Sequence, residues 1–171
     1  MIRSLAVILV PLLAITFFAT RNLDDAPVSV VDWQPVLARA RAEAPYPVLA
    51  PTNLPPDWRA TRVNWVKTGD PFLNGQPAVR NTWQLGFLAP DNTYIALNQG
   101  DVDPAEFIQD ESREGRPDGE SVVAGQKWQR LVTDDDRTRS LVLSQPSVTT
   151  VVVGDTSYQA LESYTATLSS G

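Results

Sequence analysis

The sequence predicts an α+β fold in which an N-terminal transmembrane helix is followed by a small antiparallel β-sheet domain. Three observations support this prediction. An uncharged apolar run lies near the start of the chain, alternating apolar residues fill most of the region after residue 58, and two short helical patterns interrupt and close the series of strands. Strands joined by short turns pair antiparallel, with helices segregated to one side. We therefore expect a short inserted helix and a C-terminal helix packed on one face.

The apolar run covers residues 5–20, between Arg3 and Arg21. At 1.5 Å per residue it spans roughly 24 Å, somewhat less than a bilayer core. It has no polar face, which argues against a buried helix of a soluble protein. Residues 18–20 make a poor cleavage site because Phe18 is large, so an uncleaved signal anchor is favoured over a cleaved signal peptide. The short leading tail favours an N-terminus on the inside, so we expect a single pass through the cytoplasmic membrane with the C-terminal domain extracytoplasmic.

Three parts follow from this interpretation. Residues 1–22 form the signal anchor, residues 23–50 a juxtamembrane stalk with a short helix over 35–43 and a proline-rich linker, and residues 51–171 the extracytoplasmic α+β domain. The linker is expected to be extended, because a residue before proline avoids the helical region. Its apolar residues Tyr46, Val48 and Leu49 indicate that it wraps onto the domain.

A period of two begins at Trp58, and it predicts six strands. Residues 90–93 supply the turn of a hairpin whose first strand carries Trp83, Leu85 and Phe87 on one face. The predicted strands are residues 58–67, 82–89, 94–99, 127–133, 140–145 and 148–153.

Two further segments have the pattern of helices. Asp103, Pro104 and Glu106 form an N-cap, a first-turn proline and a capping-box partner, and this helix should end before Gly115. The last helix is expected over residues 156–168, with Thr156 and Gln159 at capping-box spacing. Its apolar stripe is Tyr158, Leu161, Tyr164 and Leu168.

Composition excludes several classes of function. The net charge is −6, and the chain has no histidine and no cysteine. An acidic chain without a basic patch does not fit nucleic-acid binding. Without histidine and cysteine, the common catalytic triads and the usual zinc, haem and iron–sulfur sites cannot form. We therefore expect no cofactor, no metal and no enzymatic activity.

Aromatic residues give the first candidate site. Trp58, Trp65, Trp83 and Trp128 would supply flat apolar area for a lipid, a glycan or a protein partner. Their places on alternating strands favour the core for most of them. Trp65 is the expected exception because its strand alternates poorly, so Trp65, Trp58 and Trp128 are the residues we expect at a ligand or partner surface.

Acidic residues give two more candidates. Three consecutive aspartates, residues 134–136, suggest Ca²⁺, but they lack the spacing of a calcium loop and indicate a solvated hairpin tip. Paired carboxylates for glycoside hydrolysis could come from one acidic cluster, although a solvated helix face is the more common explanation. The cluster consists of Glu106, Asp110, Glu111 and Glu114.

Several short motifs resemble a known family. Residues 54–59 (LPPDWR) are similar to its Leu-Pro-x-Gly-Trp entry, and residues 83–87 (WQLGF) to its aromatic–glycine strand. Residues 90–99, Gly125 with Trp128, and Gly154 with Asp155 also match. The family is the actinobacterial single-pass membrane proteins with domain of unknown function 4245 (DUF4245). The resemblance covers nearly the whole chain and implies a signal anchor and an extracytoplasmic domain, but no reaction.

The leading hypothesis is a membrane-anchored binding or scaffolding module of the cell envelope, attached through its N-terminal helix, with an envelope protein as partner. A domain that binds a small lipid, glycan or peptide ligand is the first alternative. A carboxylate-based hydrolase is the second.

Overall fold

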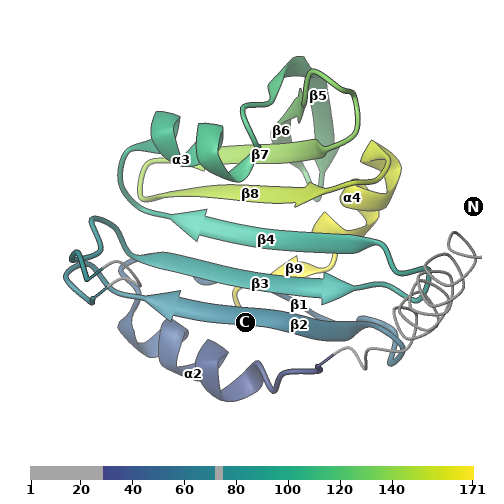
Figure 1. The fold of residues 1–171 in the computed structure, drawn as a ribbon. Coiled ribbons are helices and arrows are strands. Elements are labelled where there is room, and N and C mark those ends of the chain that lie inside the picture. Colours follow the sequence, from purple (N-terminus) through teal and green to yellow (C-terminus); the bar gives the residue numbers. More distant parts are fainter. Residues whose placement is uncertain (1–28, 72–74) are drawn as a thin grey trace, which may run out of the picture.

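The computed structural model describes residues 29–71 and 75–171, and its centre is a seven-stranded antiparallel sheet (Figure 1). Two meanders, β2 to β4 and β5 to β8, meet where β4 pairs with β8, which gives the order β2-β3-β4-β8-β7-β6-β5. Three helices accompany the sheet in this part of the chain, so the predicted α+β class is confirmed. The elements are α2 (Gln34–Glu43), β1 (Ala50–Pro51), β2 (Arg59–Val66), β3 (Thr82–Leu88), β4 (Tyr94–Gly100), α3 (Pro104–Glu111), β5 (Arg116–Val123), β6 (Gln126–Val132), β7 (Arg139–Gln145), β8 (Val148–Gly154), α4 (Tyr158–Thr165) and β9 (Leu168–Ser169).

Six strands of the sheet begin and end within one residue of the ranges that the sequence predicts. The sequence pattern misses the seventh, β5, because Pro117 and Gly119 resemble a turn and most of its side chains are exposed. In the structure β5 pairs with β6, with an irregular register between Pro117 and Glu120. Proline and a bulge are common protections for an edge strand, which is the place that β5 occupies.

Helices cover both faces of the sheet. On one face, α2 and α4 pack on the main core, to which β3 contributes Trp83, Leu85 and Phe87. On the other face, Phe107 of α3 packs against Ala96 and Val151 in a smaller core. The expectation that the inserted and the C-terminal helix share one face is therefore wrong. Both faces of the central strands β4 and β8 carry apolar residues, and both must be shielded from water.

The proline-rich segment before β1 packs onto the main core, as the sequence predicts. Tyr46 and Val48 are buried, and the backbone N–H of Leu49 donates to Oε1 of Gln99 at 2.8 Å. The indole Nε1 of Trp83 donates to the carbonyl oxygen of Leu49 at 2.9 Å. Residues 34–50 of the expected stalk thus contribute to the core, while residues 23–28 lie outside the described residues.

The start of α3 differs from the predicted capping box. Asp103 is the N-cap residue, but its backbone is left-handed, with φ 50° and ψ 65°, and its side chain makes no capping hydrogen bond. Glu106 pairs with Arg80 instead of reaching back to the N-cap. A tertiary ion pair has therefore taken the place of the local capping hydrogen bond.

The last helix is shorter than predicted. Ser157, rather than Thr156, is the N-cap, and its hydroxyl accepts a hydrogen bond from a backbone N–H of the first turn. The helix ends at Thr165, and Leu168 pairs with Pro51 in the two-stranded β1–β9 sheet. Pairing with the proline-rich segment thus takes the place of a final helical turn.

No helix within the described ranges has the length and apolar character needed to cross a membrane. The predicted anchor, residues 5–20, lies outside those ranges.

Candidate functional site

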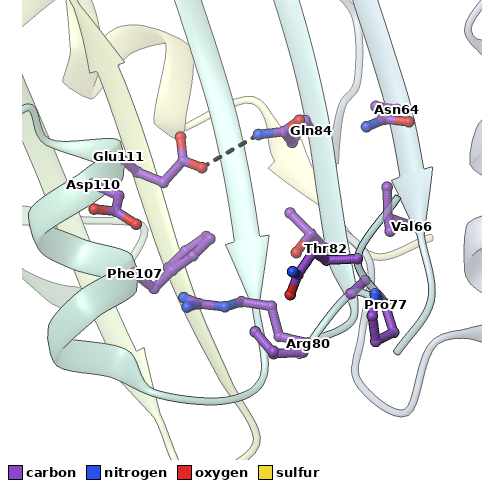
Figure 2. Close-up of a pocket in the computed structure, with 12 residues that line it drawn as sticks. Asn64, Val66, Pro77, Arg80, Thr82, Gln84, Phe107, Asp110 and Glu111 are labelled. Carbon is purple, nitrogen blue, oxygen red and sulfur yellow. Dashed lines mark hydrogen bonds between the residues drawn. The ribbon is translucent and has the colours of Figure 1, made fainter. Parts of the chain in front are cut away.

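A groove lies between helix α3 and strands β2 and β3, on the face of the sheet opposite the main core (Figure 2). Its volume is about 360 Å³, at the small end of the range for ligand sites. Cross-strand register builds its floor, because Asn64 and Val66 of β2 stand opposite Gln84 and Thr82 of β3. The residues between them point into the main core.

The two ends of the groove differ. Val66, Pro77, the ring of Phe107 and the side chain of Arg80 line one end, and Figure 2 shows the side chains of Gln84 and Glu111 directed toward each other at the other end. The side-chain amide of Gln84 donates to Oε1 of Glu111 at 3.3 Å. The groove thus has apolar surface beside an arginine at one end and a carboxylate at the other.

Glu111 is the most unusual residue of the groove. No ion pair among the described residues includes it. Partial burial raises the pKa of its carboxyl group, and the charge of Asp110 adds to this. The charges of Arg62 and Arg80 and the hydrogen bond from Gln84 lower it in part. The ionised form of Glu111 is therefore poorly compensated by its surroundings.

Arg80 connects the groove to α3. Its side chain is only 12% exposed, pairs with Glu106 and lies over the Phe107 ring, with 5.6 Å between Cζ and the ring centroid. Ion pairing and the cation–π contact together stabilise this cation. Arg80 thus supports the helix, and its charge, like that of Arg62, offsets the charge of Glu111 only in part.

The four carboxylates proposed from the sequence as a hydrolytic cluster are not brought together. Asp110 and Glu111 line the groove, both from α3. Glu106 is paired with Arg80, and Glu114 follows the helix in a left-handed conformation with φ 59°. Glycoside hydrolysis needs two carboxyl groups facing each other across a cleft, whereas Asp110 and Glu111 are neighbours on one wall. No metal-binding group of three or more acidic residues is present in the part of the chain described.

The tryptophans predicted at a partner surface lie in or against the main core. Trp65 is 6% exposed and Trp128 is 4% exposed, and Trp58 is half-buried, with its ring stacked at 5.8 Å on Tyr164. The indole Nε1 of Trp65 donates to Oε2 of Glu43 at 2.9 Å. Trp65 is therefore a core residue and not the expected exception, because α2 covers the strand face on which it lies.

The three consecutive aspartates occupy the tip of the β6–β7 hairpin, as predicted for a solvated turn. Arg116 pairs with Asp136 at 2.8 Å and with Asp134 at 3.6 Å. Asp135 accepts hydrogen bonds from the Thr133 hydroxyl and from a backbone N–H, and these lower the pKa of its carboxyl group. The turn is thus held by hydrogen bonds within the hairpin and by ion pairs to Arg116 of the neighbouring strand β5.

The sequence did not reveal a second polar cluster, on the α4 side of the sheet. Arg130 of β6 donates to Oε1 of Glu162 on α4 at 2.7 Å and to the Ser121 hydroxyl of β5 at 2.6 Å. The Ser121 hydroxyl in turn donates to Glu162 at 2.6 Å. These contacts fasten α4 to the end of the sheet, and only a tertiary structure could bring them together because their residues lie on three elements.

The fold and the groove together define a small α+β domain with a polar groove on one face of its antiparallel sheet. It belongs to the family described as "Protein of unknown function (DUF4245)", whose model matches residues 1–168. No curated protein sequence matches the chain. Among solved structures, "The complex structure of Pseudomonas aeruginosa MucA/MucB" is similar at 14% identity and a TM-score of 0.37, over 71% of this chain and 34% of that one. The chain thus spans about a third of the length of that neighbour.

Proposed function

We propose that this protein is a single-pass, membrane-anchored binding module of an actinobacterial cell envelope, with its sheet domain outside the cytoplasmic membrane. The proposed anchor is residues 5–20, an uncharged apolar run between Arg3 and Arg21. The domain engages an envelope protein and carries out no reaction.

The observation that carries the binding role is the groove between α3 and strands β2 and β3. It presents a partly buried carboxylate, Glu111, that has no ion-pair partner among the described residues. Such a group costs free energy in the unbound domain, because burial of an ionised carboxylate is unfavourable without compensation. A partly buried charge that does not stabilise the fold is the kind of feature expected at a functional site. The placement of both groove carboxylates on one helix supports a binding role over glycoside hydrolysis, which needs two carboxyl groups facing each other.

The membrane orientation has a direct test, because the chain contains no cysteine. Ser147 is exposed in the tight turn between β7 and β8, so Ser147→Cys introduces one accessible thiol. A membrane-impermeant maleimide should label this variant in intact cells as fully as in lysed cells. Labelling that requires lysis would place the domain in the cytoplasm and would refute the proposed location.

The binding role is tested by photo-crosslinking in living cells. A photoreactive amino acid at Asn64, an exposed residue on the groove floor, should give an adduct of one defined mass. The same group at Glu120, exposed on the edge strand β5, is the matched control. Adducts of equal yield at both positions, or none at Asn64, would contradict a partner in the groove.

A further inference from the structure

We propose that the groove receives a long cationic side chain, lysine or arginine, carried on an extended peptide segment of the partner, with Glu111 as its counter-ion. This inference rests on the proposed binding function and names the chemistry of the partner.

The lining matches such a side chain at both ends. Lysine and arginine have an aliphatic stem and a charged head, and they bury the stem along apolar surface. Val66, Pro77 and Phe107 supply apolar surface at one end of the groove, where the paired Arg80 also lies, and Glu111 supplies a carboxylate at the other (Figure 2). A volume of about 360 Å³ suits one long side chain rather than a large ligand.

Charge complementarity selects a cation. Of the charged residues that line the groove, Arg80 is already paired with Glu106, which leaves Asp110 and Glu111. Arg62 donates to Oε1 of Gln84 at 2.8 Å, and its charge offsets that of Glu111 in part. The residues that line the groove still hold two carboxylates and one arginine, which is paired outside the lining with Glu106. A cation close to a partly buried carboxylate is attracted more strongly than one in water.

The floor of the groove favours a peptide as the carrier of the cation. Asn64 and Gln84 stand opposite each other on β2 and β3 and both line the groove. Side-chain amides both donate and accept hydrogen bonds, as peptide groups of an extended segment require. Asn64 is exposed and within reach of an incoming chain, whereas the Gln84 amide already bonds Glu111 and Arg62.

The test measures binding of a fluorescein-labelled twelve-residue glycine–serine peptide with one central lysine to the full chain in lipid nanodiscs, by fluorescence anisotropy. Acetylation of the lysine should weaken binding at least tenfold. Glu111→Gln should do the same, and Glu120→Gln, the same charge change on the opposite edge strand, should leave the Kd within twofold. Thr82→Phe, which fills the groove without a change of charge, should also weaken binding at least tenfold.

Three results would overturn the inference. The first is binding of the acetylated peptide as tight as that of the lysine peptide, and the second is an equal loss of affinity in Glu111→Gln and Glu120→Gln. The third is complete displacement of the peptide by spermidine at the same concentration as the peptide, because the peptide backbone would then contribute nothing to binding. If no peptide binds while the Asn64 adduct still forms in cells, the cationic ligand is wrong and the binding module stands. If the adduct is also absent, both proposals fail.

Discussion

The phenol ring of Tyr94 lies directly over the α carbon of Gly86. The two residues are diagonal neighbours on adjacent strands, since Gly86 pairs with Ala96 and Tyr94 with Leu88. A β carbon at position 86 would lie 2.1 Å from the Tyr94 hydroxyl oxygen, far inside van der Waals contact. The glycine is required here by a close approach between side chain and backbone, because its φ is not in the left-handed region. It allows the half-buried Tyr94 to lie flat on the α3 face of the sheet.

Gly86→Ala is expected to lower the free energy of unfolding by about 1–3 kcal/mol, the usual range for an overpacked site. Urea unfolding followed by circular dichroism measures this change. The matched background is Tyr94→Ala, which removes the ring that the new methyl group meets. In that background the same glycine substitution should cost little, and an undiminished cost would show that the ring is not the cause.

Gln99→Leu should detach the proline-rich segment from the core. Gln99 is 1% exposed, and its side-chain amide bonds Leu49, Pro47 and Thr150. Leucine is similar in size but leaves the partly buried Leu49 N–H without this acceptor, which costs about 1–3 kcal/mol. Amide hydrogen exchange at Leu49 should become faster. Gln145→Leu, at an exposed position at the end of β7, should change neither the free energy of unfolding nor the exchange rate at Leu49.

Glu162→Gln should remove part of the acid sensitivity of the fold. Hydrogen bonds from Ser121 and Arg130, and the charge of Arg130, lower the pKa of the Glu162 carboxyl group. A lowered pKa stabilises the folded state above the unfolded-state value and loses this contribution as pH falls through the folded-state value. At pH 7 the variant should be less stable by no more than about 1 kcal/mol, the range for partly exposed ion pairs. Equal acid sensitivity of both proteins in urea unfolding at pH 7 and pH 3 would contradict this.

Glu111→Gln should change the stability at pH 7 in the opposite direction to Glu162→Gln. Burial raises the pKa of the Glu111 carboxyl group, so between the unfolded-state and folded-state values the folded protein binds more protons and its stability rises as pH falls. The variant should therefore be more stable than the natural chain at pH 7. This difference should disappear below the ordinary glutamate pKa, where both side chains are neutral. Thermal unfolding at pH 7 and pH 3 measures it, and a less stable variant at pH 7 would refute the account of Glu111.

Local sequence patterns predicted the strands that are apolar on at least one face. The alternation of Trp83, Leu85 and Phe87 gave the β3–β4 hairpin and its buried side. Strand β5 was missed because its exposed residues, with Pro117 and Gly119, follow no apolar period. Its partner β6 holds it in the sheet through backbone hydrogen bonds, which a one-dimensional pattern does not record.

The sequence by itself determined the fold class, the two hairpins flanking the sheet centre, the proline-rich segment on the core and the absence of histidine and cysteine chemistry. Only the tertiary structure decided which face α3 covers, and with it the site. Glu111 and Gln84 are 27 residues apart and meet because α3 packs on the face opposite the main core. Periodicity tells which residues share a face, whereas the choice between two faces depends on the free energy of packing over the whole sheet.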